Sequence, residues 1–206
     1  MAETLSTDEL LPNLTTDELR FIDDVEKFTL SLLETARPFD LEHTKATVYW
    51  TKEICQHEGL DPIILLPAAY FHDTGYSKIN NSKNNKNQNH AVISANIANN
   101  FILNHQFSRH LSYFQTFNII HSVHYHDQLS QVHLFQNNIY LTTLLEAVTL
   151  AHIDVDRVGT IFHKDGLATY ISKELIDQRE PLITNAFSRK QYNILSAKLY
   201  SYCIQM

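Results

Sequence analysis

Residues 63–75 read IILLPAAYFHDTG, and this stretch decides how the chain is expected to fold. Its first part, Ile63 to Phe71, is apolar on every face of a helix, which predicts a helix buried on all sides. The helix is expected to begin after Asp61 and to end near Gly75. His72 and Asp73 therefore close a core helix, where an isolated charged group is costly unless it is paired or binds a metal.

The rest of the chain also favours helices over strands. Only 4 of the 206 residues are glycine, so tight turns are few, and no segment alternates apolar and polar residues over any length. We predict an all-α fold, a single-domain helical bundle over residues 1–206. Helical periodicity and capping residues predict helices over residues 16–38, 40–58, 61–75, from 90 onward, 108–125, 138–156, 167–178 and 188–205.

The expected organisation is an N-terminal helix (16–38), a core (40–160) and a C-terminal helical extension (161–206). The polar, Asn-rich segment 78–89 is a surface connection or a loop that contacts substrate.

Composition excludes several classes of function. The net charge is −7 and no basic run exists, which argues against general nucleic-acid binding. The glycines are too far apart for a P-loop or a dinucleotide fingerprint, and the two cysteines are too far apart for a zinc finger. No apolar stretch is long enough to span a membrane and the N-terminus does not resemble a signal peptide, so we expect a cytoplasmic protein with no membrane partner.

Polar residues on buried helices mark the candidate site. His43 shares the apolar face of its helix, and an antiparallel neighbour would bring it to His72 and Asp73. Asp154 follows an apolar run over residues 144–151. Two imidazoles and two carboxylates form a nitrogen and oxygen donor set that suits Mn, Fe, Co, Ni, Zn or Mg.

Four segments together carry a resemblance to a known family: residues 42–44, 66–76, 90–98 and 154–159. In their order, His, His-Asp and Asp, they resemble the HD-domain metal-dependent phosphohydrolase superfamily over about residues 40–160. The resemblance implies that fold, with the first metal ion held by His43, His72, Asp73 and Asp154. It also implies that Asp73 stays within reach of the water molecule that attacks the substrate.

Further histidines decide between one divalent metal ion and two. The resemblance implies that His90 and His126 hold a second ion or act as catalytic groups. On the helix expected at 108–125, one phase buries His121 and His124. The other phase buries Ile119 and Val123 and brings His126 into line, and we expect this second phase. We expect the remaining histidines to be surface or structural residues: His57, His105, His110, His133, His152 and His163.

The resemblance implies a phosphohydrolase that acts on a nucleotide or another small phosphorylated metabolite. The metal would lower the pKa of a bound water and supply hydroxide to the phosphate ester. Two alternatives remain open: an HD-fold di-iron oxygenase, and a non-catalytic module that binds a nucleotide or metal to regulate a partner. A homodimer is compatible with the sequence.

Overall fold

The chain folds as helices throughout the part that a computed structural model describes, which is residues 14–79, 89–129, 137–158 and 170–205. The expected all-α class is confirmed. The Asn-rich residues 80–88, His133 and His163 lie outside the described residues. The α-helices are α2 (Thr16–Leu33), α3 (Pro38–Glu58), α4 (Pro62–Phe71), α5 (His90–Asn104), α6 (Tyr113–Tyr125), α7 (Ile139–Ile153), α8 (Val155–Val158) and α10 (Ala186–Gln205). Three short 3₁₀ helices are η1 (Thr74–Lys78), η2 (Gln106–Arg109) and η5 (Glu180–Leu182). The segment η4 (Tyr170–Arg179) is a π-helix.

Local capping chemistry sets where several helices begin and end. The prediction of one helix over 108–125 was wrong, because Ser112 and Gln115 form a capping box that starts α6 at Tyr113. The helix expected over 138–156 is also interrupted. At Asp154 the backbone adopts φ −83° and ψ 80°, which ends α7 at Ile153 before α8 begins.

Helix α4 lies at the centre of the larger apolar core. All of its residues from Ile63 to Phe71 are buried, as expected for a helix that is apolar on every face. Apolar side chains from α2, α5, α6 and α7 pack against it. Burial of this central helix fixes the position of its last turn, and hence of His72 and Asp73.

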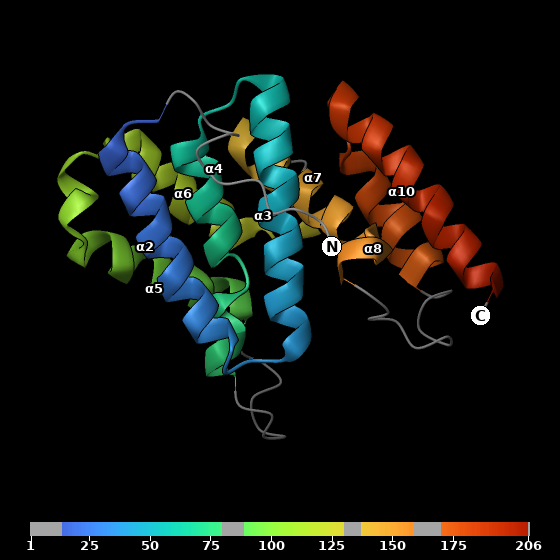
Figure 1. The fold of residues 1–206 in the computed structure, drawn as a ribbon, viewed down its shortest axis with the longest axis horizontal. Coiled ribbons are helices and arrows are strands. Elements are labelled where there is room, and N and C mark those ends of the chain that lie inside the picture. Colours follow the sequence, from blue (N-terminus) through green and yellow to red (C-terminus); the bar gives the residue numbers. More distant parts are fainter. Residues whose placement is uncertain (1–13, 80–88, 130–136, 159–169, 206) are drawn as a thin grey trace.

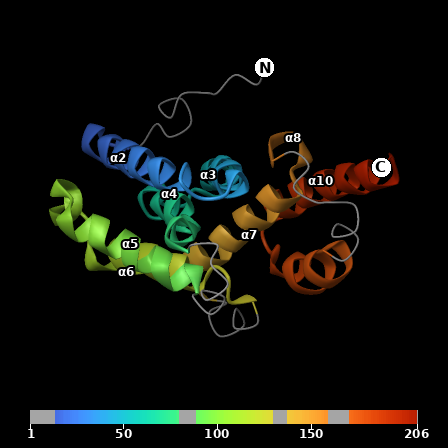
Figure 2. The same ribbon diagram turned by 90° about the horizontal axis from the view of Figure 1, so that it is seen from below.

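A second apolar core joins α3 and α7 to the C-terminal helices. It contains Trp50 and Ile54 of α3, Leu150 of α7, and Leu195 and Leu199 of α10. In both views α10 and residues 170–182 lie on the side of α7 that faces away from α2 (Figures 1 and 2). Helix α7 therefore contributes to both cores.

A buried carboxylate attaches the C-terminal helices to α7. Glu146 is 1% exposed, and its Oε1 accepts hydrogen bonds from the backbone N–H of Thr184 (2.7 Å) and of Asn185 (3.1 Å). The Asn185 side chain donates to the other oxygen, Oε2. These bonds fix the turn that links η5 to α10.

We find no membrane-spanning candidate among the helices of the described residues, since none combines the length and the apolar character that crossing a bilayer requires.

Candidate metal centre

Asp73 lies at the centre of a buried cluster of four histidines. It follows the last turn of α4 and is 6% exposed. Its Oδ2 lies 3.2 Å from His72 Nε2 and 3.9 Å from His43 Nε2. Its Oδ1 lies 3.4 Å from the Nε2 atoms of both His90 and His126. The two oxygens of one carboxylate thus face two different pairs of imidazoles.

Backbone carbonyl groups fix the orientation of two of these imidazoles. His72 Nδ1 lies 2.7 Å from the carbonyl oxygen of Ala69, and His126 Nδ1 lies 2.7 Å from that of Val123. A carbonyl oxygen only accepts hydrogen bonds, so each Nδ1 carries the proton. In the neutral imidazole each Nε2 then presents a lone pair, and both Nε2 atoms face Asp73.

The donor atoms fit a bound cation. His126 Nε2, with its lone pair, lies 3.2 Å from His90 Nε2 and faces a carboxylate oxygen. His72 Nε2 is buried and makes no hydrogen bond to any described residue, although it is 3.2 Å from Asp73. Electron-rich atoms that face one another in a buried space need a proton or a metal ion between them. Two overlapping donor groups result: His43, His72 and Asp73; and Asp73, His90 and His126.

The backbone brings His90 to the cluster through a close contact at Gly75. The Gly75 N–H donates to Ser94 Oγ (2.7 Å) on α5. A Cβ atom at Gly75 would lie 2.2 Å from the carbonyl oxygen of His90. The Tyr76 ring stacks on the His90 ring at a centroid distance of 4.2 Å. Glycine at position 75 therefore allows η1 to pack directly against the start of α5.

Burial and charge keep His43 and Asp73 in the protonation states that bind metals. Burial lowers the pKa of His43 to about 3, although the charge of Asp73 opposes the shift. Burial alone would raise the pKa of Asp73, but the surrounding imidazoles of His72, His126 and His90 hold it well below its usual range. At neutral pH the carboxylate is ionised and His43 is neutral, as metal coordination requires.

The cluster opens into a cavity of about 180 Å³. Two arginines line it: Arg37, which is the residue before α3, and Arg179, which is the last residue of η4. The Arg37 guanidinium forms two hydrogen bonds with Asp40 (2.7 and 2.9 Å) and lies over the Tyr76 ring. The cavity thus combines metal donors with cationic side chains.

Asp154, the fourth ligand expected from the sequence, is not brought to this cluster. Its Oδ2 accepts a hydrogen bond from Trp50 Nε1 (3.1 Å) and pairs with Arg157 Nε (3.2 Å). Burial raises the pKa of Asp154, and the charge of Arg157 opposes that shift. Asp154 lies at the C-terminus of α7, where the chain turns into α8, and the two partners hold its carboxylate there.

His152, which sequence reasoning treated as a surface or structural residue, lines the cavity instead. Its ring centroid lies 4.2 Å from that of His43, and its Nδ1 lies 2.9 Å from the carbonyl oxygen of Val148. A signal for it was present in the sequence. A polar residue on a helix as apolar as α7 needs a partner, and that argument applies to His152 as much as to Asp154.

The structure brings five of the six expected site residues together: His43, His72, Asp73, His90 and His126. The expected phase of α6 is present, since Ile119 and Val123 are buried and His126 follows the helix on the same side. His121 and His124 are partly buried on other faces, where His121 lies 3.3 Å from the Asn138 side chain.

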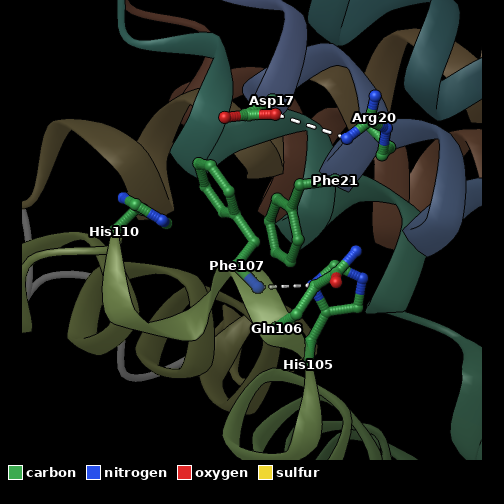
Figure 3. A pocket seen from close by; sticks show the side chains of 7 residues that line it. All are labelled: Asp17, Arg20, Phe21, His105, Gln106, Phe107 and His110. Carbon is green, nitrogen blue, oxygen red and sulfur yellow. Dashed lines mark hydrogen bonds and ion pairs between the residues drawn. The ribbon is translucent and has the colours of Figure 1, made fainter.

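A second cavity, of about 190 Å³, lies between α2 and η2 (Figure 3). Three of its polar side chains already have partners: Arg20 pairs with Asp17, and His105 lies 3.1 Å from Asp24 and accepts from the Phe107 N–H. Within the described residues, no group of metal donors was found here. The Asp73 cavity is therefore the candidate functional site.

Within its described residues the chain is an all-helical protein that gathers four buried histidines around one aspartate, a donor set that could bind a metal ion. The HD domain model matches residues 40–156, more than half of the chain. The chain belongs to the HD domain family. No curated protein and no solved structure matched the chain.

Proposed function

We propose that this protein is a metal-dependent phosphohydrolase that cleaves a phosphate ester of a nucleotide or another small phosphorylated metabolite. An HD domain with a buried histidine–aspartate cluster is consistent with that activity. One observation supports it most directly: the two oxygens of Asp73 face separate pairs of histidines. A carboxylate in this position suits two ions that act on one phosphoryl group.

His43, His72 and Asp73 would hold one ion, and Asp73, His90 and His126 the other. A divalent ion bound there lowers the pKa of a water molecule and polarises a phosphoryl oxygen. Three protein donors in each group leave coordination positions for water and substrate. The chain's own residues keep the donors oriented, through the Nδ1 contacts of His72 and His126 with backbone carbonyl groups.

His90 has a second role open to it. Its Nδ1 lies 3.7 Å from Asp127 Oδ2, a carboxylate that is about half exposed. If His90 stays outside the coordination of an ion, this pairing lets it carry a proton to the leaving oxygen.

The volume of the cavity limits what the substrate places inside it. At about 180 Å³ the cavity is smaller than the ~300–1,000 Å³ typical of sites that enclose an entire small molecule. It suits the ions and a phosphoryl group. The nucleoside or other leaving portion would extend out through the cavity mouth, which agrees with a substrate recognised mainly by its phosphate.

The test is elemental analysis of the purified protein, followed by a screen of nucleotides and generic phosphate esters with added Mn²⁺. We expect a stoichiometric divalent metal and turnover of at least one ester. Asp73→Ala is expected to lose both, while His110→Ala, which replaces an exposed histidine outside the Asp73 cavity, retains both. Turnover by metal-free Asp73→Ala protein would refute the proposal.

The same geometry favours a second candidate, an HD-fold di-iron oxygenase. Four histidines around one shared carboxylate also suit two iron ions. Two measurements separate the candidates: whether the protein retains iron, and whether turnover requires dioxygen. Hydrolysis of a phosphate ester under anaerobic conditions supports the phosphohydrolase. Bound metal without turnover of any kind would favour the regulatory module instead.

A further inference from the structure

Arg179 reaches the metal centre from outside the matched family segment. It is the last residue of η4, 23 positions beyond the end of the match at residue 156. The residue is 5% exposed and lines the same cavity as His43, Asp73 and His152. The C-terminal extension therefore contributes a buried cation to the site.

The protein satisfies only part of this guanidinium. Its Nε donates to Glu174 Oε1 at 2.9 Å, but Nη1 is buried and has no hydrogen-bond partner within the described residues. Two other arginines differ. The fork of Arg37 engages both oxygens of Asp40, and Arg189 Nη2 donates to the carbonyl oxygens of Glu180 and Ile183. A buried N–H group without an acceptor is costly, so Arg179 is suited to an acceptor supplied by a ligand.

The charge of Arg179 points to an anionic ligand. A guanidinium beside metal donors repels the metal ions that those donors would hold. Two divalent ions together with Arg37 and Arg179 would carry more positive charge than the carboxylates that line the cavity can balance, which are those of Asp40, Asp73, Asp127 and Glu174. An oxyanion in the cavity would balance this charge and accept the free N–H groups of Arg179.

We propose that Arg179 binds the phosphoryl oxygens of the substrate beside the metal ions, so that the C-terminal extension completes the site. This inference rests on the proposed function for its choice of a tetrahedral phosphate over other anions. Glu174, through its bond to Nε, positions the guanidinium with Nη1 free.

The test measures phosphate binding rather than turnover. Full-length protein loaded with Mn²⁺ is titrated with inorganic phosphate by isothermal titration calorimetry. We expect Arg179→Met to weaken phosphate binding at least tenfold without reducing metal content, and Arg179→Lys to weaken it less. Arg189→Met is the matched control: Arg189 also pairs with a glutamate but does not line the cavity, so phosphate affinity should not change.

Wild-type phosphate affinity in folded, metal-loaded Arg179→Met protein would overturn the inference. If that variant does not fold, Arg179→Lys decides, because it keeps the charge but lacks the fork: unchanged affinity there would also overturn it. Failure of the proposed function looks different. Phosphate binding that depends on Arg179 without turnover of any ester supports this inference and counts against the hydrolase. Turnover of an ester together with phosphate binding that is independent of Arg179 supports the hydrolase and overturns this inference.

Discussion

The carboxylate of Asp154 accepts a hydrogen bond from Trp50 and pairs with Arg157 at the end of α7, and it belongs to neither donor group around Asp73. Asp154→Ala removes both interactions and leaves the buried indole N–H without a partner. We expect the free energy of unfolding to fall by about 1–3 kcal/mol, while bound metal stays at the wild-type stoichiometry. Chemical denaturation and elemental analysis check this together. Loss of metal from a folded variant would return Asp154 to the ligand set.

His152 is expected to orient His43 for metal binding, because both residues line the cavity and their ring centroids are 4.2 Å apart. His152→Ala removes that support. A tenfold to hundredfold loss of metal affinity is typical when a residue that orients a ligand is replaced. Competition with a chelator of known affinity measures the loss. His105→Ala, at the other cavity, is the control, and equal metal affinity in His152→Ala and wild type would show that His152 is not needed.

A comparison of His126 with Asp154 and His152 shows which site residues a local sequence pattern can identify. His126 could be predicted because burial of Ile119 and Val123 fixes the phase of α6, and the phase fixes the side on which His126 lies. Asp154 and His152 are only two positions apart at the end of α7. The choice between them depends on Trp50, 104 residues earlier in the chain, which holds the aspartate. A long-range contact of this kind leaves no local pattern in the sequence.

The junction between η1 and α5 depends on the missing side chain of Gly75. A Cβ atom there would overlap the carbonyl of His90, so Gly75→Ala is expected to push the start of α5 away from Asp73. We expect the variant to lose metal from the His90 side and fall from two ions per chain toward one. Elemental analysis gives the stoichiometry.

Gly59→Ala is the matched control for this prediction. Gly59 ends α3 with a positive φ of 64°, but nothing lies within 4 Å of the added Cβ atom. Alanine there strains the backbone and should lower the free energy of unfolding by about 1 kcal/mol without changing metal content. If both glycine variants retain two ions, the close contact at Gly75 does not position His90.

Helix ends were predicted less well than helix identities, for a physical reason. Apolar periodicity indicates which side of a helix is buried. Buried apolar residues continue from η2 up to the start of α6, since Phe107 and Leu111 are both buried. The break comes from the capping box of Ser112 and Gln115, which depends on two side chains and not on the apolar pattern.

The free energy of unfolding of the metal-free protein is expected to depend on pH. The pKa of His43 is about 3 in the folded state, against about 6.5 in an unfolded chain. Between these values the unfolded chain binds a proton that the folded chain does not, so stability falls as the pH is lowered from 6.5 toward 3. One such group contributes a slope of up to about 1.4 kcal/mol per pH unit.

Urea denaturation in the presence of a chelator, at several pH values between 7 and 4.5, measures this slope. His43→Gln is expected to reduce it. Some dependence should remain, because burial also lowers the pKa of His152, which acts in the same direction. Equal slopes in the variant and in wild type would show that His43 does not carry the effect.

Local sequence patterns predicted the all-α class, but they did not predict how the helices assemble into two apolar cores. Apolar periodicity shows that α7 is buried, but not that it faces α4 on one side and α10 on the other. The same limit applied to Arg179. Its position at the cavity follows from how η4 packs after the family segment, and its sequence context is that of an ordinary charged helix.

The split of Asp73 between two histidine pairs has a thermodynamic consequence. Whichever ion arrives first neutralises part of the carboxylate that the second ion must share, and it adds a positive charge a few ångströms away. Filling should therefore be stepwise and anticooperative, with one tight and one weak affinity. At low metal supply most molecules would carry a single ion, so cellular metal concentration would set how many copies hold the complete pair.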